Sequence, residues 1–65
     1  MNRIKELREE KGLKQGYLEK KLKLYPSQLH DWENEFKYPN VIQAIKLAKQ
    51  LDTTVEELYV IEEDK

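Results

Sequence analysis

Apolar residues spaced three or four positions apart are the feature that most restricts the fold of this chain. Ile4 and Leu7 show this spacing near the start, and Leu18 and Leu22 repeat it further on. This spacing places side chains on one face of an α-helix, whereas a strand needs strict alternation of apolar and polar residues. No alternation long enough for a sheet occurs, so the pattern predicts an all-α protein.

Glycine, proline and capping residues divide this pattern into five helices joined by short loops. The first helix ends at Gly12, because glycine suits the left-handed position that follows a helix. The second begins near Gln15. The third covers residues 26–33, since Pro26 is accepted in the first turn of a helix, where its missing N–H has no partner to lose. Leu29 and Trp32 form the inward face of this third helix.

The fourth helix carries the clearest signal. Asn40 and Gln43 are spaced to form a capping box, in which each side chain accepts a hydrogen bond from the other residue's backbone N–H. Thr54 with Glu57 predicts a second capping box, which starts a final short helix that turns Leu58 inward. The predicted buried stripe of the fourth helix consists of Val41, Ala44, Ile45, Ala48 and Leu51.

Composition limits the remaining possibilities. The chain of 65 residues has no cysteine and one histidine, so it predicts neither disulfides nor a metal site. Ser27 has no base near it in the sequence and no glycine-rich phosphate loop occurs, so neither an enzyme nor a bound cofactor is expected. No apolar run approaches a membrane span, and the charged N-terminus is not a signal peptide. We expect a single cytoplasmic domain over residues 1–65.

Charge is distributed unevenly. Residues 1–51 carry eleven Lys or Arg against seven Asp or Glu, whereas residues 52–65 carry one against six. A basic body with an acidic tail, here about residues 60–65, is consistent with a nucleic-acid-binding surface on the body. An acidic end that only aids solubility explains the same numbers equally well.

Four segments of the chain stand in a specific order and spacing: "IKELREEKGLKQ" (4–15), "LEKKLKLYPSQLHDWEN" (18–34), "YPN" (38–40) and "AIKLAKQLDTTVEELY" (44–59). Together they resemble the phage-repressor and Cro-like helix-turn-helix regulators, also called the xenobiotic-response-element type. The likeness covers residues 2 to 60, approximately. It implies a compact five-helix, lambda-repressor-like DNA-binding domain whose helix-turn-helix unit spans about 15–34 and whose third helix enters the major groove.

The resemblance also implies roles for individual residues. It implies an ion pair between Arg8 and Glu33 that ties the first helix to the third. The expected partner is a double-stranded DNA operator, bound by a bacterial or phage-encoded repressor that is nucleoid-associated when bound. The expected base contacts come from Ser27, Gln28, Asp31 and Pro26, and the expected phosphate contacts from Gln15, Asn34, Lys37 and Tyr38.

Some positions depart from the family pattern. Relatives have a small residue at position 19 and glycine at positions 23 and 35, where this chain has Glu19, Lys23 and Glu35. Asp31 faces the expected groove, where its carboxylate is repelled by phosphates. These departures favour an alternative, a protein-interaction module on the same fold, such as an antirepressor or a heterodimerising partner. Lys14 and Gly16 at the start of the second helix predict that it is the least stable element.

The C-terminal segment supplies more apolar surface than a small core can easily cover. Helix-turn-helix proteins commonly bind two half-sites as dimers, so we expect a homodimer. A chain end that folds back over its own core is the simpler alternative. The predicted interface consists of Leu58, Tyr59, Val60 and Ile61.

Overall fold

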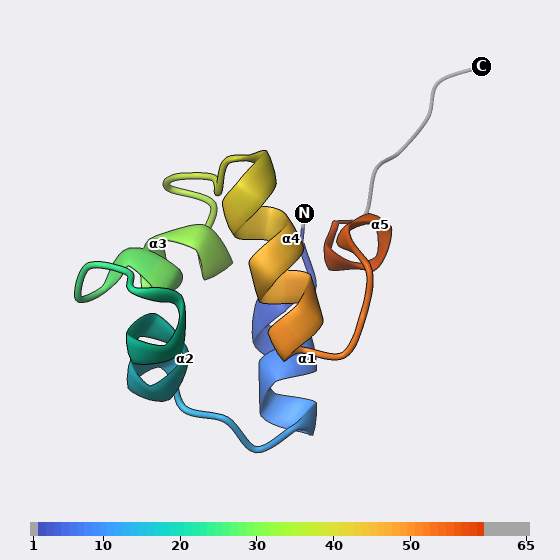
Figure 1. The fold of residues 1–65 in the computed structure, drawn as a ribbon, viewed down its shortest axis with the longest axis horizontal. Helices are drawn as coiled ribbons and strands as arrows, with labels where there is room; N and C mark the ends of the chain where they lie inside the picture. The colour runs from blue at the N-terminus through green and yellow to red at the C-terminus, as the bar shows by residue number, and fades with distance from the viewer. Residues whose placement is uncertain (1, 60–65) are drawn as a thin grey trace.

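The computed structural model describes residues 2–59, which form five α-helices (Figure 1). The only β pairing among these residues is an isolated antiparallel bridge between Asn2 and Tyr59. The prediction of an all-α fold is confirmed. No helix in this part of the chain is long and apolar enough to span a membrane. The helices are α1 (Ile4–Glu10), α2 (Gln15–Leu22), α3 (Gln28–Glu33), α4 (Val41–Gln50) and α5 (Val55–Leu58).

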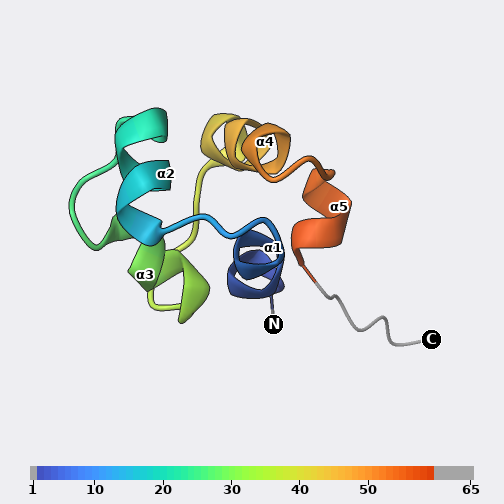
Figure 2. The ribbon, with the colours of Figure 1, turned by 90° about the horizontal axis from the view of Figure 1, so that it is seen from below.

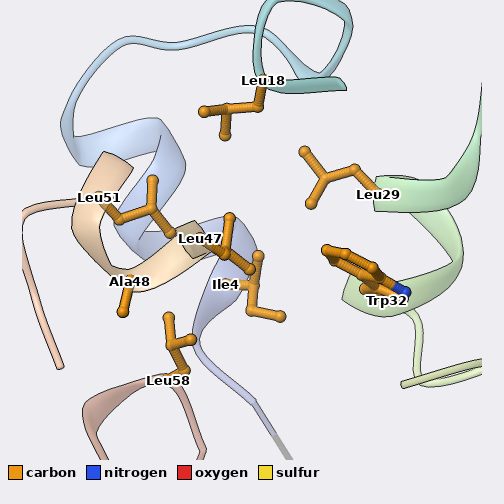
Figure 3. Close-up of a cluster of buried hydrophobic side chains, with 8 residues drawn as sticks. All are labelled: Ile4, Leu18, Leu29, Trp32, Leu47, Ala48, Leu51 and Leu58. Atoms are coloured by element: carbon orange, nitrogen blue, oxygen red, sulfur yellow. The ribbon is translucent and has the colours of Figure 1, made fainter. Parts of the chain in front are cut away.

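A single apolar cluster holds the five helices together. Figures 1 and 2 show α1 and α4 in the middle, with α2 and α3 on one side and α5 on the other. Every helix contributes at least one fully or almost fully buried side chain to the space between them (Figure 3). Burying each large aliphatic or aromatic group contributes about 1.5–3 kcal/mol to folding. The cluster consists of Ile4, Leu18, Leu29, Trp32, Leu47, Ala48, Leu51 and Leu58.

Four of the helices end in the same way. At the end of α2, the N–H of Lys23 donates to the carbonyl of Lys20 (3.3 Å), and the N–H of Leu24 donates to the carbonyl of Glu19 (2.8 Å). This pair of hydrogen bonds is a Schellman motif, and it requires one residue in the left-handed region. That residue is Gly12 after α1, Lys23 after α2, Glu35 after α3 and Asp52 after α4, with φ between 58° and 70°.

The prediction of a glycine C-cap at Gly12 is therefore confirmed. Lys23 and Glu35 occupy left-handed positions where the family pattern has glycine. A side chain in this region costs about 1–2 kcal/mol, because Cβ approaches the carbonyl oxygen that follows it. The chain folds despite this cost, since the Schellman hydrogen bonds satisfy carbonyl groups at each helix end.

The structure confirms the predicted start of α4 and corrects its buried face. Asn40 Oδ1 accepts from the N–H of Gln43 (2.8 Å) and Gln43 Oε1 from that of Asn40 (3.0 Å), which completes the capping box. The prediction that Val41 and Ile45 are core residues is wrong, because their side chains are 72% and 41% exposed. Leu47, absent from the predicted stripe, is fully buried. The inward face runs through Ala44, Leu47, Ala48 and Leu51, which places Val41 and Ile45 on the outward side.

The predicted capping box of α5 does not form. Thr54 precedes the helix as predicted but makes no side-chain cap. The carboxylate of Glu57 instead accepts from the hydroxyl of Thr53 at 3.1 Å, so it does not reach the N–H of Thr54. Val55 is partly buried against the core.

The C-terminal end of α5 packs beside the N-terminus. Leu58 is fully buried, and its carbonyl accepts from the N–H of Arg3 at 2.7 Å. Its side chain therefore has no exposed surface to offer a second subunit, contrary to the predicted interface. Burial raises the pKa of the half-buried Tyr59 phenol, and the nearby Glu35 and Tyr38 raise it further. The other two predicted interface residues, at positions 60 and 61, lie outside the described residues.

Candidate nucleic-acid interface

The helix expected to read DNA begins with a tight turn. The N–H of Gln28 donates to the carbonyl of Tyr25 (3.0 Å), with Pro26 and Ser27 at the two central positions. Ser27 has φ 71° and ψ 2°, the values of the third residue of a type II turn, for which proline is favoured at the second. Because Ser27 is left-handed, it is not part of a helix, and α3 starts at Gln28. The predicted helix over 26–33 is thus two residues too long at its N-terminus.

Glu19 caps this helix from a neighbouring element. Ser27 makes no side-chain cap, and the carboxylate of Glu19 on α2 accepts from the N–H of Leu29 at 3.1 Å. A carboxylate near the first turn satisfies a free N–H and complements the positive end of the helix dipole. Glu19 is therefore compatible with close packing of α2 on α3, where the family pattern has a small residue.

A largely buried network fixes the other end of α3. Arg8 Nε donates to Glu33 Oε2 at 2.6 Å, and Arg8 Nη1 donates to the carbonyl of Leu13 at 2.7 Å. Gln15 Nε2 donates to the other carboxylate oxygen of Glu33 at 2.8 Å. The Arg8 and Glu33 side chains are 10% and 2% exposed, so the ion pair implied by the family resemblance is present and shielded from water. It joins α1, the start of α2 and α3.

The outward side of the turn and of α3 surrounds a shallow hollow. Pro26, Gln28 and Asp31, three of the expected base contacts, line it. Lys37 from the loop after α3 and Tyr25 from the turn before it complete the lining. Ser27, the fourth expected base contact, is exposed in the same turn. The fold thus gathers residues from both sides of α3 into one surface.

Side chains on this surface differ in how free they are to bind. Gln28 Oε1 accepts from the N–H of Tyr25 at 2.9 Å, but its Nε2 has no acceptor among the described residues. Asn34 Nδ2 donates to the carbonyl of His30 at 2.8 Å, and the amide of Gln15 is committed to Glu33. Lys37 and Tyr38, the remaining expected phosphate contacts, are exposed to solvent.

Charges on the hollow nearly cancel. Lys37 is its cation and Asp31 its anion. Asp31 Oδ1 lies 3.9 Å from His30 Nδ1, so a protonated His30 partly offsets the carboxylate. A surface with so little positive charge gains little from counterion release on DNA. What the surface offers a ligand is its shape and its hydrogen-bonding groups.

Sequence reasoning missed two residues of this region. Tyr25 is 78% exposed on the rim of the hollow, and an aromatic residue directly before the turn proline was the signal available for it. The cap provided by Glu19 had no local signal, because residues 19 and 29 are brought together only by the packing of α2 on α3.

Comparison with known proteins identifies the arrangement. A protein-family model described as helix-turn-helix matches residues 4–58, from the first residue of α1 to the last of α5. No curated protein and no solved structure matches the chain. The family model covers most of the sequence, and the all-helical fold is consistent with this domain. The chain belongs to the Cro-like helix-turn-helix family of DNA-binding transcription regulators.

Proposed function

We propose that this regulator is a homodimeric repressor that reads an operator through the surface around α3. The observation that carries the proposal is the hollow shared by Pro26, Gln28, Asp31 and Lys37, which combines base-reading groups with a phosphate-binding cation. Base edges supply sequence information, and phosphate contacts fix the position of the protein on the duplex. Occupying an operator in this way blocks transcription.

Base readout falls to side chains of the turn and the first turns of α3. The free Nε2 of Gln28 can donate to a base, and glutamine suits adenine. Asp31 can accept from the amino group of cytosine, while Ser27 and Pro26 lie at the end of α3 that enters the groove first. Tyr25 adds a phenol hydroxyl on the same rim.

Phosphate contacts surround these bases. Lys37 and Tyr38 follow α3 and are exposed, and Asn34 ends that helix. Gln15 contributes its backbone N–H rather than its amide, since the first N–H groups of α2 have no helical partner and its side chain is bound to Glu33. These contacts strengthen binding to any sequence and weaken as salt is added.

A homodimer compensates for the weak charge of one reading surface. Two copies bound to half-sites one helical turn apart double the phosphate contacts and read a pseudo-palindromic operator. Tyr59 is half-buried and stays part of the proposed interface.

The test is binding to fluorescent mixed-sequence duplex DNA over a series of salt concentrations. Wild type binds at low salt, and Lys37→Ala lowers the log–log salt slope by about two for the bound dimer, because each subunit loses one phosphate contact and each contact contributes about 0.9. Gln28→Ala leaves the slope unchanged and reduces the preference for a selected operator over mixed sequence. Lys5→Ala removes the same charge from the exposed side of α1 and serves as the matched control. A folded chain that binds no DNA even at low salt refutes the proposal.

A further inference from the structure

The outward face of α4 carries exposed aliphatic side chains and lysines that have no role in the proposed reading of DNA by α3. Val41, Ile42 and Ile45 are 72%, 61% and 41% exposed, although aliphatic side chains of this size are usually buried. Lys46 and Lys49 continue the same face toward the C-terminal end of the helix, at spacings of three and four residues. The face is therefore apolar at one end and basic at the other.

A second helix extends the basic end of this face. Lys21 and Lys23, at the end of α2, line a hollow together with Lys46 and Lys49, with Leu22 and Gln50 between them. Figure 2 shows α2 and α4 side by side. No acidic residue lines the hollow. It is also distinct from the hollow beside α3, with which it shares no residue.

These four lysines have no counter-charge within the described part of the chain. None of them makes a hydrogen bond or ion pair with residues 2–59, where the one lysine ion pair is Lys11 with Asp52 at 3.6 Å. Like charges gathered around one hollow repel one another. An anionic ligand with an adjoining apolar part would relieve the repulsion and cover the exposed aliphatic side chains at the same time.

One such segment is found in the chain itself. Residues 60–64 read "VIEED", two large aliphatic residues followed by three acids. We propose that this segment of a second copy binds along α4, with Val60 and Ile61 on the apolar end and Glu62 to Asp64 on the lysine hollow. The proposal rests on the homodimer of the proposed function and gives it a surface that Leu58 cannot provide.

Length and position favour a second copy over the segment's own chain. The face from Val41 to Lys49 is about 12 Å long, and five extended residues span at most about 18 Å, enough to cover it and reach the hollow. The described chain ends at Tyr59, which is bridged to Asn2. Figure 2 places the N-terminus on the side of α1 away from α4. The segment therefore starts on the side of its own molecule opposite α4.

Two complementary charge reversals test the proposal in the full chain. Lys21→Glu with Lys46→Glu and Lys49→Glu makes the hollow acidic, with Lys23 as its one remaining cation. Glu62→Lys with Glu63→Lys and Asp64→Lys makes the segment basic. Each variant alone then opposes like charges, so its self-association weakens by about tenfold or more in sedimentation equilibrium at low salt. An equimolar mixture restores opposite charges at both contacts and associates as wild type does.

Every other result overturns the proposal. A wild type that stays monomeric, or single variants that dimerise as strongly as wild type, exclude this interface. Monomeric single variants that fail to associate when mixed would mean that the segment binds its own chain or nothing. Unchanged circular dichroism shows that each variant is folded. Each monomeric variant is also tested for binding to mixed-sequence DNA. If it still binds DNA, only the dimer interface is affected, and the proposed DNA binding fails only if this binding is lost as well.

Discussion

Glu19 lies on α2 opposite the start of α3, where the family pattern has a small side chain. Its carboxylate accepts from the N–H of Leu29, a role that a residue just before α3 usually performs. Ser27 cannot perform it, because its left-handed backbone places it in the preceding turn. A residue that looked like an obstacle to close packing thus stabilises the contact between the two helices of the DNA-binding unit.

Replacing Glu19 tests this role directly. Glu19→Ala removes the acceptor and lowers the free energy of unfolding by about 1 kcal/mol, the usual loss for a helix cap. Glu19→Gln keeps an oxygen in place of the carboxylate and retains most of that stability. Urea denaturation followed by the fluorescence of the buried Trp32 measures both changes. Equal stability of the two variants would show that Glu19 is not a cap.

Among the elements, four helices share one C-terminal motif, and only one of the four left-handed positions is glycine. The positions are otherwise alike, since each follows a helix whose last carbonyls accept from the next two N–H groups. Lysine and glutamate store strain there, whereas aspartate tolerates the left-handed region better. Substitutions at these helix ends can therefore raise the free energy of unfolding without any change in the core.

Lys23→Gly is the cleanest test of that strain. Lys23 is exposed and has φ 58°, so glycine relieves the Cβ contact and raises the free energy of unfolding by about 0.5–1 kcal/mol. Lys23→Ala is the control, because it removes the charge and keeps the Cβ. Thermal unfolding of both variants should show a gain for glycine alone. A gain for alanine of the same size would assign the effect to charge.

The start of α2 has a different weakness. Gly16 lies within the helix, and a methyl group built on it meets no atom within 4 Å. Gly16→Ala should therefore raise the free energy of unfolding by about 0.5–1 kcal/mol, because glycine costs that much in a helix.

Gly12→Ala provides the opposite case. A methyl group built on Gly12 also meets no atom within 4 Å, but φ at this position is +70°. Alanine is strained in that conformation, so the substitution destabilises the protein. Denaturation of the two variants under the same conditions compares them. A loss of stability in both would mean that α2 needs glycine for another reason.

Local signals were enough to predict most of the helices. Asn40 with Gln43 and the glycine at position 12 act within a few residues of themselves, and the structure places both as predicted. The start of α3 was missed because the left-handed conformation of Ser27 belongs to a turn that commonly has glycine at that position. Val41 and Ile45, two of the exposed residues of α4, were misassigned because the sequence alone does not show whether an aliphatic side chain of a helix faces the core or the surface.

At the scale of the whole molecule, charge and apolar surface divide the protein into separate regions. One cluster joins all five helices, the hollow beside α3 carries almost no net charge, and the lysines of α2 and α4 form a second hollow. The Arg8–Glu33 pair was predictable from the family pattern. The two hollows were not, because each is built by residues from elements that only the folded chain brings together.

The proposed DNA-binding surface consists of the turn, α3 and the loop that follows it. The most direct measurement is an NMR titration of the isotopically labelled full chain with a mixed-sequence duplex at low salt. The largest amide shifts should fall on residues 25–38 and near Gln15. Shifts concentrated on residues 41–49 and the end of α2, or no shifts at all, would contradict the account.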